Sequence, residues 1–144
     1  MNINILRNTS SGFTVIQLLL SVLVLGIIVS GFFYLLNNER SKTRDAERLA
    51  DMARVQAAFQ MLYATNASYI SAAENGCGTV GSLVNSCNLT AQMPDIGTIK
   101  DPGQYAYTVN AIPSDQGYEV VFRLENSYGS LKSGFHSITE DGLR

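Results

Sequence analysis

Hydrophobic residues fill one long stretch near the N-terminus, from Gly12 to Leu36. No Asp, Glu, Lys, Arg or His occurs anywhere from Asn8 to Asn38, so this stretch has no charged face. A helix that begins at Phe13 and ends at Leu36 is roughly 36 Å long, since each residue adds about 1.5 Å. That length crosses a hydrocarbon core of about 30 Å. The pattern predicts a membrane-spanning helix, because a soluble core helix usually carries a polar face.

The few polar residues inside this stretch are mostly small hydroxyl residues, which can hydrogen-bond back to their own helix. They are Thr14, Gln17, Ser21, Ser30 and Tyr34. Gln17 is the exception, because its side chain is a longer amide.

From Asn37 to Thr65 the chain has no Pro or Gly and is rich in helix-forming residues. Apolar residues recur three and four positions apart, which predicts one buried helix face. They are Leu49, Met52, Val55, Phe59 and Leu62, with Ala46, Ala53 and Tyr63 beside them. The charged residues expected off this face are Glu39, Arg40, Arg44, Arg48 and Asp51. Asp45 with Arg48 and Asp51 with Arg54 are spaced for weak local ion pairs. We therefore predict one continuous helix of about fifty residues, with Asn66 as a left-handed stop.

The remainder reads as a loop-like linker, from Ser68 to Pro102, followed by strands. Alternating apolar and polar residues predict three strands, at 105–109, 118–125 and 135–139. Three antiparallel strands can cover the amphipathic half of the helix. The expected fold class is therefore α+β, with a long N-terminal helix packed against a small antiparallel sheet of about three strands.

Charge is distributed unevenly along the 144 residues, although the net charge is only −2. Six basic residues face four acidic ones up to Asn66, whereas four face eight after it. Nucleic-acid affinity rests on clustered Lys and Arg, so the acidic C-terminal part predicts no nucleic-acid partner.

The two cysteines, Cys77 and Cys87, form an even pair in a segment expected to leave the cytoplasm. This predicts one disulfide, with two unpaired buried thiols as the alternative.

Residue sets for catalysis or metal binding are not found in the sequence. His136 is the only histidine, the cysteines lack zinc spacing, and neither a nucleophile elbow nor a phosphate-binding loop motif occurs. Asp115, Glu140 and Asp141 are candidate calcium ligands, but they fall short of the six to eight oxygens that calcium takes. We therefore expect no enzyme activity, no cofactor and no metal.

The junction Gly12-Phe13-Thr14-Val15-Ile16-Gln17-Leu18-Leu19 resembles the processing signal of type IV prepilins and type II secretion pseudopilins. The resemblance implies that a prepilin peptidase cuts after Gly12 and that Phe13 is then N-methylated. Gly26 also falls where this family usually has glycine. The N-terminal helix would anchor the chain in the inner membrane and later pack against copies of itself and other pilins in a filament.

With this resemblance, four segments are expected along the chain. They are a cleaved leader at 1–12, a transmembrane and assembly half-helix at 13–36, an amphipathic half-helix at 37–66 and a globular part at 67–144. A count of Lys and Arg alone would place the C-terminal side in the cytoplasm. The cleavage motif and the cysteine pair imply the opposite, with the N-terminus inside and the globular part outside.

Gln17 departs from the family, which usually has Glu at this position and pairs it with a neighbour's terminal amine. A neutral side chain cannot neutralise that amine, so a minor or initiating subunit, such as one at a filament tip, is one hypothesis. A main subunit that tolerates Gln17 is the rival, and a secretion pseudopilin stays open. The alternative class is a single-span, membrane-anchored binding module that does not polymerise.

Overall fold

The computed structural model describes residues 14–144, and α1 occupies Val15–Asn66 as one helix of 52 residues. The predicted continuous helix is therefore confirmed. Its end differs by one residue, because Asn66 remains helical and Ala67 adopts the left-handed conformation with φ of 53°. The chain divides into two compact units after Asn38. We call the second unit, Glu39–Arg144, the head.

The head contains a four-stranded antiparallel sheet rather than one of about three strands. Its strands follow chain order: β1 at Thr108–Ala111, β2 at Glu119–Leu124, β3 at Gly134–Thr139 and β4 at Gly142–Leu143. The short β4 was missed because its two residues are too few to show alternation. It pairs with Ile138 and Thr139 at the end of β3.

The first predicted strand is displaced along the chain. The ladder between β1 and β2 starts at Thr108, opposite Val121, and not at Tyr105. The Tyr105 ring instead lies against the guanidinium groups of Arg48 and Arg123, and its backbone N–H donates to Asp101 Oδ1 at 3.3 Å.

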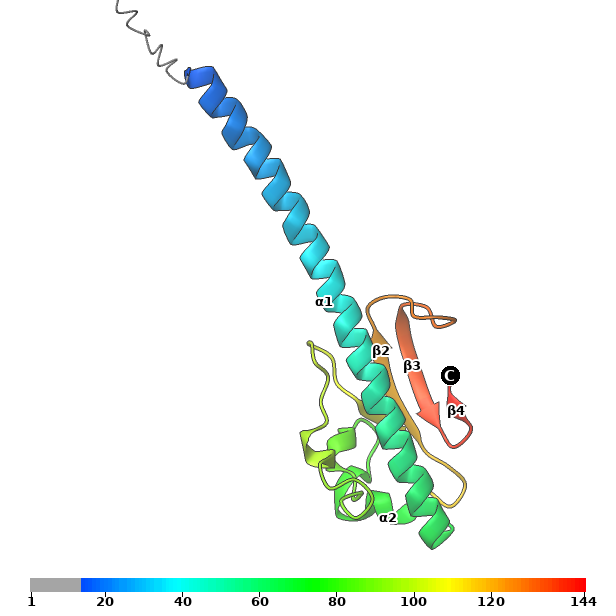
Figure 1. Ribbon diagram of the computed structural model, residues 1–144. Helices are drawn as coiled ribbons and strands as arrows, with labels where there is room; N and C mark the ends of the chain where they lie inside the picture. Colours follow the sequence, from blue (N-terminus) through cyan, green and yellow to red (C-terminus); the bar gives the residue numbers. More distant parts are fainter. Residues whose placement is uncertain (1–13) are drawn as a thin grey trace, which may run out of the picture. The chain divides into compact units, whose positions relative to one another are not determined.

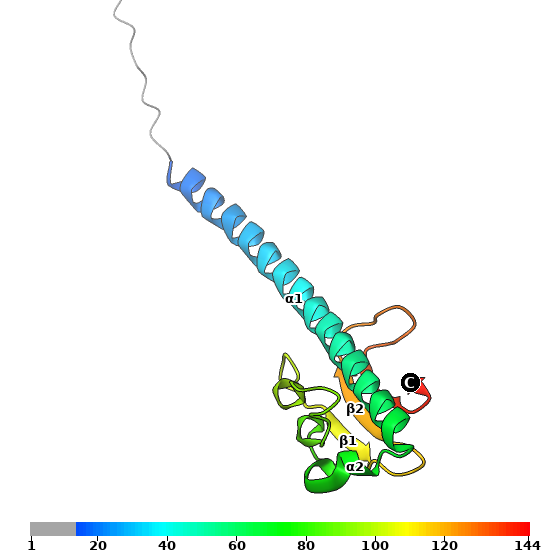
Figure 2. The same ribbon diagram turned by 60° about the horizontal axis from the view of Figure 1, so that its bottom comes forward.

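The segment between α1 and β1 is not a plain loop, because it contains four short helical turns. They are α2 at Ile70–Ala72, a π-helical turn at Ala73–Cys77 and 3-10 turns at Val84–Ser86 and Ile96–Thr98. Figures 1 and 2 show this segment beside α1.

One face of the sheet packs against the head part of α1 (Figure 1). Alternate residues of β2, namely Val120, Phe122 and Leu124, are buried, while the intervening residues are half-buried. Aromatic rings fill the core near the end of α1: Phe59 stacks on Tyr118, with ring centroids 3.9 Å apart. Each large apolar side chain buried this way contributes about 1.5–3 kcal/mol.

Candidate functional site

The described part of α1 before the head is exposed on all sides. Its large apolar side chains, from Val15 to Leu36, are 36–76% exposed. An 18-residue window in α1 has a mean hydropathy of 2.6, and none of it is buried. By length and composition, α1 is therefore able to cross a membrane.

Three polar side chains in this segment hydrogen-bond within the helix. Ser21 Oγ donates to the Leu18 carbonyl at 2.8 Å, and Ser30 Oγ donates to the Gly26 carbonyl. The Thr14 N–H donates to Gln17 Oε1 at 3.1 Å. Gln17 thus caps the start of its own helix, which is the position that Gln takes in a capping box.

Gly26 and Gly31 have no packing role within the described chain. A Cβ built on either residue meets no atom within 4 Å. Glycine also lowers helix stability by about 1 kcal/mol relative to alanine. The predicted cleavage residues, Gly12 and Phe13, lie outside the described residues, so the site of processing stays a prediction.

The head holds a buried charge network, which we define as Asp45, Arg48, Asp101 and Glu125 together with Arg44. Arg48 is completely buried and forks onto Asp101, with its Nε 2.6 Å from Oδ2 and its Nη2 2.9 Å from Oδ1. Its Nη1 also donates to Asp45 at 2.8 Å and to Glu125 at 2.7 Å. Arg44 completes the network with a second bidentate contact to Glu125.

This network joins three parts of the chain: α1, the segment before β1 and the end of β2. Asp45 accepts hydrogen bonds from the backbone N–H groups of Glu125 at 2.9 Å and Asn126 at 2.7 Å. Asp101 accepts one from the Gly103 N–H at 2.7 Å. The buried carboxylates therefore anchor the polypeptide backbone to α1 as well as pairing with Arg48.

The charged forms of these groups are favoured. Burial alone would lower the pKa of Arg48, but hydrogen bonds from its guanidinium to Asp101, Glu125 and Asp45 raise it above the ordinary value. The hydrogen bond from Arg44 lowers the pKa of Glu125 to about 2. Burial would also raise the pKa of Asp45 and Asp101, but hydrogen bonds outweigh burial and lower both values.

The predicted pair between Asp45 and Arg48 therefore forms, but the expectation that Arg48 lies off the buried face was wrong. They form a buried anchor rather than a weak surface pair. A signal was present in the spacing: extending the buried stripe backwards from Met52 by four and then three residues reaches Arg48 and Asp45. Conversely, Ala46 and Ala53, which were expected beside the buried face, are exposed.

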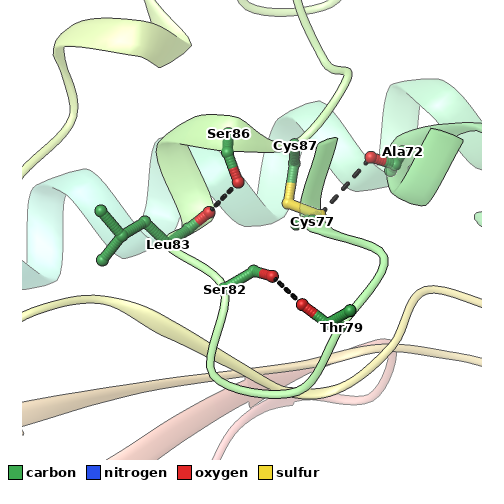
Figure 3. The surroundings of a disulfide bond; sticks show 7 residues. All are labelled: Ala72, Cys77, Thr79, Ser82, Leu83, Ser86 and Cys87. Carbon is green, nitrogen blue, oxygen red and sulfur yellow. Dashed lines mark hydrogen bonds between the residues drawn. A yellow bond between two sulfur atoms is a disulfide. The ribbon is translucent and has the colours of Figure 1, made fainter. Parts of the chain in front are cut away.

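Cys77 and Cys87 form the predicted disulfide, and both residues are buried (Figure 3). It ties a π-helical turn to the residue that follows a 3-10 turn. A Cβ on Gly76 would lie 2.0 Å from the Ser86 carbonyl oxygen, so the close backbone approach beside the disulfide requires glycine.

Two of the three candidate calcium ligands, Asp115 and Asp141, have partners within the described residues. Asp115 accepts from Ser68 Oγ at 2.6 Å, and Asp141 pairs with Arg144. Among residues 14–144, no group of three or more His, Cys, Asp or Glu side chains is arranged to hold a metal ion. His136 Nε2 lies 2.7 Å from the Lys132 carbonyl oxygen.

No protein-family model, curated protein or solved structure gives a significant match to the chain. Inferences about its function therefore rest on its own residues.

Proposed function

We propose that the chain is a structural subunit of a filament of the type IV pilus or type II secretion pseudopilus kind. The observation that carries this proposal is the charge-free, exposed helix from Val15 to Leu36, which follows directly on the Gly12-Phe13 junction. In a membrane, lipid covers this surface. In a filament, helices of other copies cover it instead, because van der Waals packing and small residues drive such association.

In this proposal, a prepilin peptidase removes residues 1–12 and Phe13 becomes the methylated N-terminus. The chain begins in the inner membrane with its N-terminus in the cytoplasm and its head outside. The disulfide supports that side for the head, since disulfides persist in oxidising compartments. The head then becomes part of a periplasmic or extracellular filament built from this chain and other pilins.

The mature N-terminus tests the proposal directly. We expect mass spectrometry of protein from peptidase-containing cells to show loss of residues 1–12 and one added methyl group on Phe13. Cells without the peptidase provide the control and should retain Met1. An intact, unmethylated chain in both cell types would instead support the alternative, a single-span anchored binding module that does not polymerise.

Gly26 separates packing in a filament from simple anchoring. Gly26→Ala adds a methyl group where the described chain has open space, so it should leave the melting temperature of the head unchanged. If neighbouring helices approach closely at this point, filament yield should fall. Gly97→Ala is the matched control, because its Cβ also meets no atom within 4 Å but lies in the head. Equal yields for both variants would contradict close packing at Gly26.

Gln17 bears on whether the chain is a main or a minor subunit of the filament. Because its side chain bonds to the Thr14 N–H of its own helix, it is satisfied without a neighbour's amine. Glu can make the same capping bond, so this contact fits both the special-subunit hypothesis, a minor or initiating subunit, and its rival, a main repeating subunit. Gln17→Glu is the test, with incorporation into filaments as the measurement. A large gain in filament content would overturn the special-subunit hypothesis and support a main subunit.

A further inference from the structure

Most charged side chains of the head are paired within it. The ion pairs join Lys42 to Glu39, Arg54 to Asp51 and Asp95, and Arg144 to Asp141, in addition to the buried network. Among the described residues, the charged side chains left without an ion pair are Arg40, Lys100, Arg123 and Lys132, and Glu47, Glu74, Asp115, Glu119 and Glu140.

Unpaired positive charge gathers on the sheet near the start of the head. Arg123 lies in β2, opposite Phe135 of β3, and Lys132 lies just before β3. The Arg123 guanidinium is 4.7 Å from the centroid of the Tyr105 ring and 5.4 Å from that of Phe135. We define the basic patch as Tyr105, Arg123, Lys132 and Phe135.

The basic patch has the composition of a contact surface. The Phe135 ring is 73% exposed, and Lys132 is also exposed. Arginine and large aromatic residues contribute most of the binding energy at many interfaces. Arg123 carries donors for a carboxylate but has no carboxylate partner within residues 14–144.

Unpaired negative charge gathers at the opposite end of the head, where α1 ends. Asp115 is held there by Ser68, directly after α1, and Glu140 packs over Gly117. Glu119 and Glu140 line the same shallow hollow, beside Arg144, whose guanidinium pairs with Asp141. We define the acidic turns as Asp115 and Glu140 together with Glu119, the first residue of the adjoining strand β2. Figure 1 shows that the turns before β2 and after β3 lie at this end, whereas the connection between β2 and β3 lies at the other.

We propose that the basic patch docks on the acidic turns of a second copy of this chain. The proposal rests on the filament function above and names the contact between its heads. Parallel copies that follow one another along an axis place the end of one head against the start of the next. A contact between two different surfaces of the same chain can repeat from copy to copy without closing, as a filament requires. Because the basic patch and the acidic turns carry opposite charges, each surface favours the other as its partner.

Zero-length cross-linking of assembled full-length chains tests this contact. Carbodiimide condenses a lysine amine with a carboxylate that touches it, forming an amide with loss of water. Filaments assembled from a mixture of ¹⁴N- and ¹⁵N-labelled chains should give mixed-label peptides that join Lys132 to Glu140 or another residue of the acidic turns. Assembled filaments in which Lys132 links only to other sites, or to none, would overturn the docking proposal and leave the filament function standing.

Charge reversal provides a second measurement on residues that make no side-chain hydrogen bond or ion pair within the described chain. Lys132→Glu and Glu140→Lys should each lower filament yield about five-fold, because like charges then meet across the contact. The double variant should recover the yield. Glu74→Lys is the control, since it reverses an unpaired charge outside both surfaces and should have no effect.

The outcomes separate the two proposals. Full filament yield from both single variants overturns the docking contact alone. Failure of the unaltered chain to be processed or to assemble overturns the filament function, and the docking contact with it. Equal melting temperatures of the three single variants show that a loss of yield comes from assembly and not from unfolding of the head.

Discussion

Arg48 is the residue on which the architecture of the head depends most. It is completely buried, yet its guanidinium reaches carboxylates from α1, from the segment before β1 and from the end of β2. A buried ion pair contributes little net stability over an apolar replacement, but a buried charge left alone is expensive. The contribution of Arg48 to stability therefore depends on the carboxylates around it.

We predict that Arg48→Met lowers the free energy of unfolding by about 3–5 kcal/mol, because Asp45 and Asp101 remain buried without their cation. Thermal unfolding of the full chain in detergent measures this loss. Arg54→Met is the matched control on the same helix. Its pair with Asp95 is exposed, so the loss should stay below about 1 kcal/mol. Similar losses for both variants would contradict the special role of the buried network.

Two buried tyrosines test the energetic effect of hydrogen bonding. The Tyr118 hydroxyl is buried and has no hydrogen-bond partner within residues 14–144, whereas the Tyr107 hydroxyl donates to Asp51 at 3.3 Å. We predict that Tyr118→Phe leaves stability unchanged or raises it, while Tyr107→Phe lowers it by about 1–2 kcal/mol. Chemical denaturation of both variants under one condition provides the comparison. A larger loss for Tyr118→Phe would show that its hydroxyl has a partner.

At the scale of elements, α1 belongs to two different environments. Its first half has no buried residue among those described, whereas seven residues after Ser41 are buried in the head. The two halves share helical geometry and differ only in which side chains the sequence supplies. One element can therefore serve as membrane span or assembly surface and also as the central support of the head.

The disulfide also acts at the scale of elements, because it constrains the segment between α1 and β1. The segment between α1 and β1 has only short helical turns, so covalent closure restricts a region that has few regular hydrogen bonds. We predict that replacing Cys77 and Cys87 together by Ser lowers the free energy of unfolding by about 3 kcal/mol. Denaturant titration with and without a reductant measures it. In the double variant, the reductant should have no further effect.

At the scale of the whole molecule, most charged side chains of the head are paired within it. The buried network makes stability depend on pH. Glu125 has a pKa of about 2, below the ordinary value of 4.5, and the pKa values of Asp45 and Asp101 are also lowered. A carboxyl group with a lowered folded-state pKa stabilises the fold above its unfolded pKa and loses that contribution as the pH falls.

We predict that stability is constant near neutral pH and falls between about pH 4.5 and pH 2. Asp51 has the opposite effect on the pH dependence, since burial raises its pKa. The three carboxyl groups with lowered pKa values outnumber it. Melting temperatures measured across this range test the prediction. Arg48→Met should lessen the dependence, because the hydrogen bond from Arg48 is the main contact that lowers the pKa of Asp101 and a further one at Glu125. An equally steep fall in that variant would place the pH dependence elsewhere.

Local sequence patterns were sufficient to predict the regular secondary-structure elements. An apolar run without charges and a three-and-four spacing predict α1, and alternation predicts the central strands, because side-chain periodicity follows directly from backbone geometry. The cysteine pair was also identified correctly. Boundaries were less certain: Tyr105 has the pattern of a strand residue, but its ring packs against two arginines.

The sequence by itself determined the α+β class, the long apolar helix and the disulfide, since each depends on residues near one another in the chain. Tertiary structure decided which charges are buried. Asp101 and Glu125 lie 53 and 77 positions from Arg48, so no local spacing reveals that they meet. It also decided that the basic patch and the acidic turns lie at opposite ends of the sheet. That separation depends on how the strands reverse direction around α1, which only the folded chain defines.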